Sequence, residues 1–284
     1  MAEYSAVAIV GVGLIGGSIG LALRERKLAR EVVGIGRREK SLASARQIGA
    51  IDRGTTDVAD GVKSAEIIVV CTPVDTIVDF VARAAAACPK NAILTDAGST
   101  KQTIVVAVEK QLGGRATGPQ FVGSHPLAGD QRSGSEYARD DLLEGRMVVV
   151  TPTDKTPAAA VETITRFWQS LGATVVTMSP AEHDAALAVT SHLPHLVAAA
   201  LAAATPEKLL PLAAGGWRDT TRIAGGDPAL WEPIFTTNRE QVLAALAEFG
   251  RRVDGLRHAL ESGDQQQLLA NLEQAKRIRD ALGN

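Results

Sequence analysis

The sequence has few aromatic residues, few cysteines and no surplus of basic charge. Phe, Trp and Tyr make up 4% of the 284 residues, so Ala, Val, Leu and Ile must fill the interior. Two cysteines, Cys71 and Cys88, are too few for a disulfide scaffold, and Cys71 ends an apolar run, which indicates a buried thiol in a reducing compartment. The 30 Lys and Arg against 32 Asp and Glu give a net charge of −2. That balance argues against nucleic acid as a partner, because phosphate binding needs a clustered basic surplus.

A long hydrophobic run is also missing. The most apolar stretch, Leu196 to Ala204, is about half the length needed to cross a bilayer. The N-terminus has neither the basic start nor the cleavage site of a secretory signal. We therefore expect a soluble, cytoplasmic protein with no membrane partner. At roughly 150 residues per domain, the length predicts about two domains, and 45% hydrophobic with 22% charged residues excludes global disorder.

Short apolar runs alternate with helical segments over the first part of the chain. Apolar strands that alternate with helices predict an α/β domain whose mostly parallel sheet is covered on both faces. The expected strands are Ala6–Val10, Val32–Ile35, Glu66–Cys71, Ala92–Thr95, Phe121–Gly123, Met147–Val150 and Thr174–Thr177.

The pattern changes near residue 179, where Ser179-Pro180-Ala181-Glu182 is a capping-box signal for the start of a helix. No convincing strand follows, so we predict a dinucleotide-binding domain over 1–178 and a helical domain over 179–284. The latter contains a seam of apolar residues at spacings of three and four, which either lines the domain's own core or pairs with a second chain. The seam consists of Val242, Leu246, Phe249, Val253, Leu256 and Leu260.

A glycine-rich turn directly follows the first expected strand and opens a helix, which is the context of a dinucleotide-binding motif. In this reading Gly11 permits the tight turn, Gly13 lets the backbone approach a pyrophosphate, and Gly16 allows close packing of helix on strand. The alternative is a plain glycine-rich turn. The motif reads Gly11-Val12-Gly13-Leu14-Ile15-Gly16.

The end of the second strand predicts which dinucleotide binds. An NAD site expects an acidic residue there for the ribose 2′-hydroxyl, but Glu31 precedes Val32–Ile35 and lies at the wrong end. After this strand come Arg37 and Arg38, and guanidinium groups can bind a 2′-phosphate in bidentate fashion. We therefore favour NADP over NAD; a solvated basic loop is the alternative.

Polar segments follow three other expected strands, where ligands bind in open α/β sheets. They are Cys71-Thr72-Pro73, the segment 96–101 with Ser99, and the segment 123–129 with His125. A histidine after a buried strand, with a pKa near neutral, is suited to take a proton as hydride leaves a substrate. The alternative is a structural loop histidine.

The helical part adds two pairs of polar residues. His192 and His195 are three apart around a proline, but no Cys or carboxylate cluster completes a metal site, so we expect no metal. Arg218 and Arg222 are four apart, and this spacing fits either a solvated helix face or a carboxylate-binding pair.

Together these motifs resemble the prephenate/arogenate dehydrogenase family of tyrosine biosynthesis over nearly the whole chain. The segments that carry the resemblance are GVGLIGGS, CTP, DAGSTK, GSHPLAG, SHLPH and WRDTTRIAGGDPALW. It implies a Rossmann-type domain followed by an all-helical domain that forms a homodimer. It also implies oxidative decarboxylation of a cyclohexadienol, with hydride passing to NAD(P) and the ring becoming aromatic.

The resemblance also implies roles for individual residues. His125 matches the catalytic histidine that bonds the substrate hydroxyl, and Ser99 the serine that orients it near the nicotinamide. Arg222 matches the arginine that holds a substrate carboxylate. Further substrate-binding positions of the family match His195, Trp231, His183, Arg218 and Gln131. Some relatives have Lys in place of Arg218, and some prephenate users have Glu in place of Gln131.

The substrate signals conflict. Retention of His195 favours prephenate, because cyanobacterial arogenate enzymes often lack it, whereas the Arg37-Arg38 loop is more typical of arogenate users. We favour prephenate, with arogenate as the alternative. No appended regulatory domain is expected, so tyrosine would inhibit by competing at the active site.

Two other classes remain open. The β-hydroxyacid dehydrogenases use a helical-domain lysine as acid/base, and Lys208 and Lys276 are the candidates here. A dinucleotide-sensing dimer would keep the fold without the chemistry.

Overall fold

The computed structural model describes residues 2–113, 118–130 and 132–283, and the chain forms two compact units, Met1–Asn238 and Arg239–Asn284. All strands of the described residues belong to the first unit and end by residue 177. The predicted domain boundary at 178/179 is therefore different from the division into compact units, and it stays a prediction.

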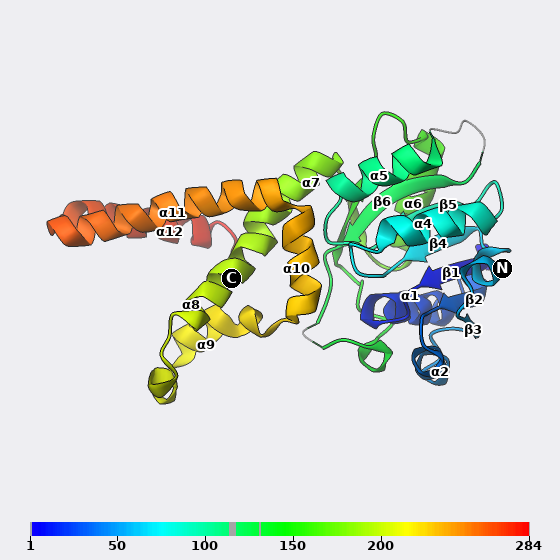
Figure 1. The fold of residues 1–284 in the computed structure, drawn as a ribbon, viewed down its shortest axis with the longest axis horizontal. Coiled ribbons are helices and arrows are strands. Elements are labelled where there is room, and N and C mark those ends of the chain that lie inside the picture. Colours follow the sequence, from blue (N-terminus) through cyan, green and yellow to red (C-terminus); the bar gives the residue numbers. More distant parts are fainter. Residues whose placement is uncertain (1, 114–117, 131, 284) are drawn as a thin grey trace. The chain divides into compact units, whose positions relative to one another are not determined.

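One eight-stranded sheet forms the centre of the first unit (Figure 1). Its strand order is β3-β2-β1-β4-β5-β6-β7-β8, and all neighbouring pairs are parallel except β6 with β7. This confirms the prediction of a mostly parallel sheet. The strands are β1 (Tyr4–Val10), β2 (Ala29–Ile35), β3 (Arg53–Thr55), β4 (Ile67–Val70), β5 (Ile93–Asp96), β6 (Gln120–Pro126), β7 (Met147–Thr151) and β8 (Thr174–Thr177).

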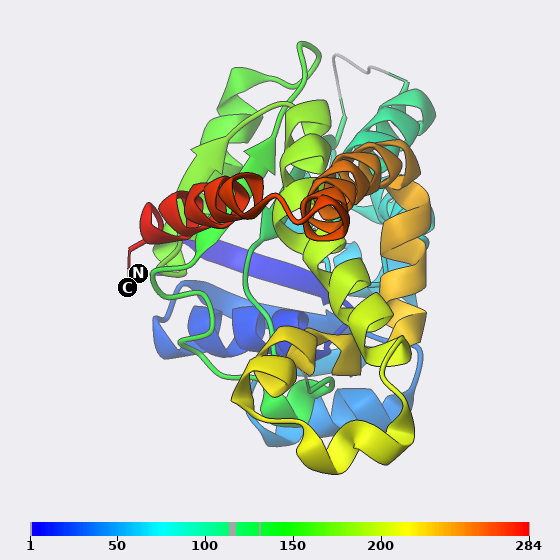
Figure 2. The same ribbon diagram turned by 90° about the vertical axis from the view of Figure 1, so that its left-hand side faces the viewer.

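Helices cover both faces of the sheet, as Figures 1 and 2 show. Alternate residues of β1 point to opposite faces: Val7 and Ile9 pack with one group of helices, and Ala8 and Val10 with the other. The first face is covered by α1 (Leu14–Glu25), α2 (Glu39–Gln47) and α6 (Ala158–Ser170). The second is covered by α3 (Val58–Val62), α4 (Ile77–Ala87) and α5 (Gln102–Leu112).

The strand order reverses between β1 and β4. The chain runs from β1 outward to β3, and then returns to place β4 on the other side of β1. In open α/β sheets the crevice at such a reversal, beyond the carboxyl ends of the strands, is where ligands bind. The fold therefore brings the glycine-rich turn after β1 next to the segment after β4.

Helices follow the sheet within the first unit. Ser179 caps α7 (Pro180–Leu187) with the predicted capping box, and a π-turn (Ala188–His192) joins α7 to α8 (Leu193–Ala203). Pro194 lies at the junction of this π-helical segment with α8. The helices after α8 are two 3-10 segments (Glu207–Leu212 and Arg222–Gly225), α9 (Gly215–Thr221) and α10 (Pro228–Thr237).

The helix from Pro180 to Ala203 is longer than the apolar stretch identified in the sequence. Its 24 residues are long and apolar enough to cross a membrane by length and composition alone. The polar residues His183, Asp184, His192 and His195 on this helix are buried within the protein.

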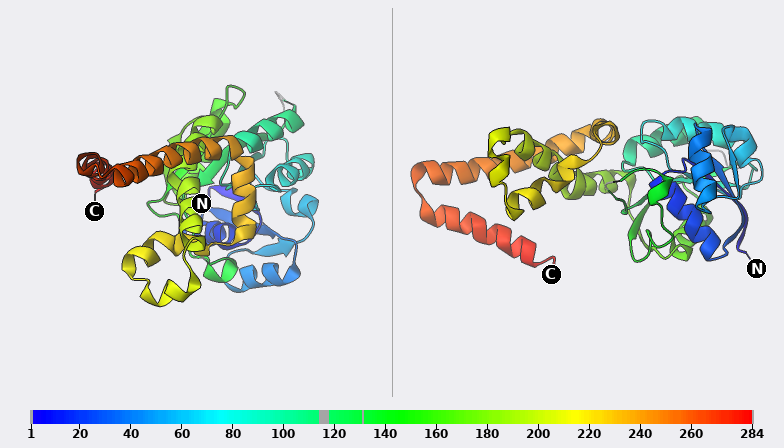
Figure 3. Two further views of the ribbon diagram at one scale, coloured as in Figure 1. Left: turned by 60° about the vertical axis from the view of Figure 1, so that its left-hand side comes forward. Right: turned by 90° about the horizontal axis from the view of Figure 1, so that it is seen from below.

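The second unit consists of α11 (Arg239–Ser262) and α12 (Gln265–Asp280), and the chain reverses direction between them (Figure 3). The six seam residues lie on α11, and Leu246, Val253 and Leu260 are 41%, 45% and 66% exposed. Val242 is buried, and Phe249 and Leu256 are half-buried. Half of the seam is thus exposed in a single chain, which leaves an apolar surface for contact with a second chain.

Candidate active site

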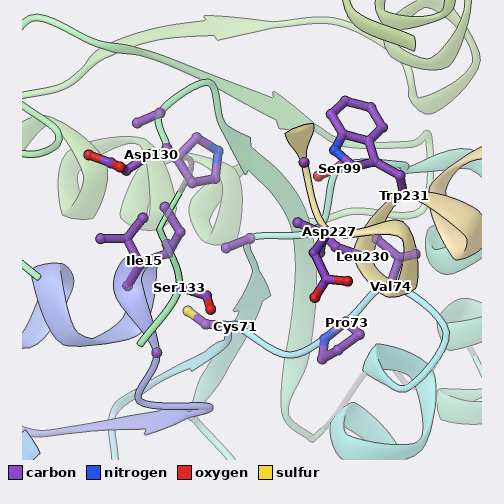
Figure 4. A pocket seen from close by; sticks show the side chains of 18 of the residues that line it. Ile15, Cys71, Pro73, Val74, Ser99, Asp130, Ser133, Asp227, Leu230 and Trp231 are labelled. Atoms are coloured by element: carbon purple, nitrogen blue, oxygen red, sulfur yellow. The ribbon is translucent and has the colours of Figure 1, made fainter. Parts of the chain in front are cut away.

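A pocket of about 890 Å³ opens at the carboxyl ends of β1, β4, β5 and β6 in the first unit. Its walls come from the turns after these strands and from the segment between Arg222 and Trp231. Most of the predicted site residues line it: Gly13, Leu14, Ile15, Cys71, Thr72, Pro73, Ser99, His125, His195, Arg222 and Trp231. In Figure 4, Ile15, Asp130 and Ser133 lie on one side of the pocket, opposite Ser99, Leu230 and Trp231.

The glycine-rich turn has the geometry that its sequence predicts. Gly11 has a φ of +93°, and a Cβ there would lie 2.7 Å from the carbonyl oxygen of Cys71. A Cβ on Gly16 would lie 2.1 Å from the carbonyl oxygen of Gly11. Both glycines therefore permit close backbone contacts behind the pocket wall. Gly13 lines the pocket, and a Cβ there would meet no protein atom within 4 Å.

The N-terminus of α1 fits the diphosphate of a dinucleotide. Gly13 is its N-cap without a side-chain cap, and the first turn contains no acidic residue. The free N–H groups of a helix N-terminus and its dipole favour a bound anion. Leu14 and Ile15 line the pocket at this end. The thiol of Cys71, predicted to be buried, is half-buried in the pocket wall, and burial raises its pKa, so it is protonated at neutral pH.

Arg37 and Arg38 follow β2 after Gly36 and do not line the pocket. The amide of Gly11 donates to the carbonyl oxygen of Ile35 (2.8 Å), so the end of β2 adjoins the glycine-rich turn. Both arginines are exposed, and neither guanidinium is paired with another described residue. Glu31 was expected before the strand but lies within β2, 3.6 Å from Arg53, still far from its carboxyl end.

His125 lies inside β6 rather than in a loop after it. The strand extends to Pro126 because β7 pairs with it in antiparallel register, with Val149 opposite His125. The sequence prediction that the strand ends at Gly123 was therefore wrong by three residues. Burial, followed by the charges of His183, Lys101 and His192, holds the pKa of His125 well below 6.5, so the imidazole is neutral at neutral pH.

Ser99 lies in the turn between β5 and α5, which a buried ion pair ties to β6. Lys101 and Asp96 are both fully buried and form this pair, and the Lys101 Nζ also donates to the carbonyl oxygen of Ser124 (2.9 Å). The second Asp96 carboxylate oxygen accepts from the amide of Ser124 (3.1 Å). The turn that carries Ser99 is thus fixed relative to His125, the next residue of β6.

The opposite wall comes from the helices after the sheet. The ring of His195, 6% exposed, stacks on Trp231, and no described residue hydrogen-bonds its Nδ1. Arg222 begins a 3-10 segment, is exposed and lines the pocket. Arg218, in contrast, does not line the pocket, and its Nε donates to the carbonyl oxygen of Ala213 (3.2 Å). Helix α9 ends at Thr221, between the two arginines, so their spacing of four does not place them on one helix face.

Two further residues that the family resemblance assigns to substrate binding are His183 and Gln131. His183 is fully buried behind His125 and does not line the pocket, because its ring bonds to His125 and Asp184 instead. The structure therefore places His183 behind His125, out of direct contact with the pocket. Gln131 lies outside the described residues.

Sequence reasoning missed several charged residues of the site. Asp130 and Arg132 line the pocket. The guanidinium of Arg132 donates two hydrogen bonds to Asp130 (3.0 and 2.9 Å) and its backbone amide donates a third (3.1 Å), and these bonds lower the pKa of Asp130. Asp227, at the start of α10, also lines it. The position of Asp130 and Arg132 directly after GSHPLAG was the available signal. Lys208 does not line the pocket, and Lys276 belongs to the second unit.

No group of three or more His, Cys, Asp or Glu residues is placed to hold a metal ion within the described parts of the chain. The expectation that no metal takes part stays a prediction.

A Rossmann-type nucleotide-binding sheet, an all-helical part after it, and a pocket that joins a glycine-rich turn to a buried neutral histidine define a dinucleotide-dependent oxidoreductase. Models of the nucleotide-binding and dimerization domains of prephenate dehydrogenase match residues 19–177 and 179–274. The chain belongs to the prephenate dehydrogenase family.

Individual relatives agree with this assignment. The chain is 38% identical to prephenate dehydrogenase of Bacillus subtilis over 97% of its own length and 76% of that protein. The structure of prephenate dehydrogenase from A. aeolicus with hydroxyphenyl propionate and NAD+ is 34% identical, with a TM-score of 0.90 and 98% of each chain covered. Arogenate dehydrogenase of Synechocystis is 29% identical, with a TM-score of 0.83 over 98% of this chain and 99% of that one.

Proposed function

We propose that the protein is a prephenate dehydrogenase, which converts prephenate to 4-hydroxyphenylpyruvate and carbon dioxide in tyrosine biosynthesis. The observation that carries this proposal is the composition of one pocket: the α1 N-terminus, Ser99, a neutral buried His125 and Arg222, whose guanidinium has no partner among the described residues, all line it. The reaction needs a cofactor site, a base for the hydroxyl and a cation for a carboxylate, and this pocket contains one group for each.

Each residue has a defined task in this reaction. When bound, the oxidised nicotinamide supplies the acceptor for the hydride that leaves the ring carbon bearing the hydroxyl. His125 takes the hydroxyl proton, and Ser99, whose Oγ has no partner among the described residues, orients the hydroxyl. Arg222 holds a substrate carboxylate. The stacked rings of His195 and Trp231 form a wall that keeps water from the reacting ring.

NADP is the proposed cofactor. Support comes from Arg37 and Arg38, which follow β2 after Gly36, are exposed and have no partner among the described residues. The absence of an acidic residue at that strand end in the sequence also supports it. We further propose that the protein acts in the cytoplasm as a homodimer through its helical part, without nucleic acid or membrane as a partner. The exposed seam on α11 supports the dimer.

L-Arogenate is the second candidate substrate. It is favoured by the same arginines, which are more typical of arogenate users, and by the likeness to an arogenate dehydrogenase structure. His195 in the pocket wall favours prephenate. The two substrates differ only in a pyruvyl or alanyl side chain.

The test is a set of four rate assays, prephenate or L-arogenate, each with NADP or NAD, following the reduced cofactor. We expect the highest kcat/KM with prephenate and NADP, and a fall of roughly a hundredfold or more in His125→Asn. A higher kcat/KM with L-arogenate would replace the proposed substrate. Folded protein that turns over neither substrate would overturn the proposed function and favour a sensing or hydroxyacid-dehydrogenase role.

A further inference from the structure

A buried histidine and a buried carboxylate lie in line behind His125. The Nδ1 of His125 is 2.9 Å from the Nε2 of His183, and the Nδ1 of His183 is 2.7 Å from the Oδ1 of Asp184. His183 is 0% and Asp184 is 2% exposed, and neither lines the pocket. These three side chains form one continuous hydrogen-bonded chain, which ends at the pocket only through His125.

The carboxylate of Asp184 is bound by the start of α5. Its two carboxylate oxygens accept the backbone amides of Lys101 (2.8 Å) and Gln102 (2.9 Å), the N-cap and first residue of this 11-residue helix. A helix N-terminus stabilises negative charge. Because both oxygens of Asp184 accept from backbone N–H groups, Asp184 acts as a hydrogen-bond acceptor in its contact with His183.

The acceptor at Asp184 determines where both imidazoles carry their protons. The Nδ1 of His183 must be protonated in order to donate to Asp184. Since burial lowers the pKa of His183, its ring is neutral and its Nε2 is an acceptor. The Nδ1 of His125 must then be the donor in the contact between the rings. A neutral His125 with a proton on Nδ1 has a bare Nε2.

We propose that His183 and Asp184 are positioning residues that fix His125 in the Nδ1-protonated tautomer, so that its Nε2 is the base for the substrate hydroxyl. This inference rests on the proposed function. The O–H bond of the hydroxyl breaks, its electron pair stays on oxygen, and the proton forms a bond with Nε2. After carbon dioxide leaves with the ring aromatised, the same proton returns to the phenolate oxygen of the product.

The chain also stabilises the charge that forms on His125. Protonated His125 donates from Nδ1 to His183, and the carboxylate of Asp184 lies at the far end of the chain. The other charged or titratable groups near these rings are Lys101 and His192, which lower the pKa of His125, and Asp96, which raises that of His183. Lys101 is paired with Asp96, so Asp184 is the carboxylate left to balance the imidazolium.

The direct test is nitrogen-15 NMR of the protein labelled at its histidines. The chain has five histidines, and single substitutions assign their signals. At a pH above their pKa values, we expect the wild-type His125 to show a protonated Nδ1 and a bare Nε2. In Asp184→Asn the carboxamide can donate to His183, so we expect both rings to change to the opposite tautomer. A bare Nδ1 on His125 of the wild-type protein would overturn the proposal. This result does not depend on which substrate the enzyme converts.

Kinetics give a second, independent readout. We expect Asp184→Asn and His183→Leu to lower kcat by about a hundredfold or more, as in other enzymes in which the tautomer of a catalytic histidine is lost, with KM changed less than about threefold. His192→Gln is the control, because His192 lies on the same long helix, equally buried, but bonds to Asn238. A kcat in Asp184→Asn close to the wild-type value, or an equal loss in His192→Gln, would contradict the proposal.

Discussion

The imidazole of His195 stacks on the indole of Trp231, with ring centroids 3.7 Å apart and planes inclined by 18°. The two residues come from α8 and α10, and together they form a flat wall of the pocket. Phe235 extends the stack, 5.5 Å from Trp231. A planar wall of this kind suits a six-membered ring that becomes flat as it aromatises.

Gly226 is required for this stack. A Cβ there would lie 2.7 Å from the Nε1 of Trp231 and 3.0 Å from the Cε1 of His195. We expect Gly226→Ala to separate the two rings and to raise the KM for prephenate about tenfold, a loss of roughly 1.4 kcal/mol of binding, in steady-state assays. Gly225→Ala is the matched control, since a Cβ at Gly225 meets no atom within 4 Å. Equal KM values in the two variants would count against the stack as a binding wall.

Arg222 and Arg218 allow a second pairwise test. Only Arg222 lines the pocket, whereas Arg218 bonds to a backbone carbonyl. We expect Arg222→Ala to raise the KM for prephenate by about ten- to a hundredfold, because a hydrogen bond to a charged group contributes about 1.5–3 kcal/mol. Arg218→Ala should change it less than about twofold. If both substitutions weaken substrate binding equally, Arg222 is not the particular carboxylate ligand.

Much of the fold could be predicted because its signals are local. The apolar strands, the glycine-rich turn and the capping box at Ser179 are each contained in a few consecutive residues. The three-residue strand β3 was missed, because Arg53–Thr55 is too short and too polar to show a strand pattern. The extension of β6 to Pro126 was missed because it depends on pairing with β7, a distant part of the chain.

The contrast between local signals and contacts of distant segments also explains which parts of the site could be predicted. Motifs identify His125, Ser99 and Arg222 by their local sequence, and all three line one pocket. The contacts of Asp184 with Lys101 and of His183 with His125 join residues that are 83 and 58 positions apart in the sequence. Their chemistry depends on burial and on the α5 N-terminus, which no spacing in the sequence reveals.

Two glycines of the same motif should respond differently to alanine. Gly16→Ala places a methyl group against the backbone of Gly11 and the side chain of Ile9 (2.9 Å), so we expect a clear loss of stability in thermal melts. Gly13→Ala meets no protein atom, and we expect a melting temperature close to that of the wild type. Its cofactor affinity, measured by fluorescence titration, should fall about tenfold, because the added methyl group occupies the approach of the diphosphate. Unchanged cofactor affinity in Gly13→Ala would argue against binding at this helix N-terminus.

The arginines after β2 should determine the choice of cofactor. We expect Arg37→Ala and Arg38→Ala to raise the KM for NADP about tenfold or more and to leave the KM for NAD within about twofold, since only NADP carries the 2′-phosphate. Lys40→Ala, an exposed cation in the following helix, is the control. Added salt should also raise the KM for NADP, because exposed charges are screened. A parallel change for both cofactors in the arginine variants would contradict a 2′-phosphate site.

Acid should destabilise the protein through its buried histidines. Burial lowers the pKa of His125, His183, His192 and His195 in the folded state, and that of His192 falls from 6.5 to about 4. Below pH 6.5 the unfolded chain therefore binds protons that the folded chain does not, so the free energy of unfolding decreases as the pH falls from 6.5 towards 4. For His192, a pKa that falls from 6.5 to about 4 corresponds to about 3 kcal/mol over that window. Urea unfolding at pH 8, 6, 5 and 4 should show this decrease in the free energy of unfolding. In His192→Gln the decrease should be smaller by about 3 kcal/mol. Parallel curves for the two proteins would mean that His192 is already protonated in the fold, or that its burial is relieved in solution.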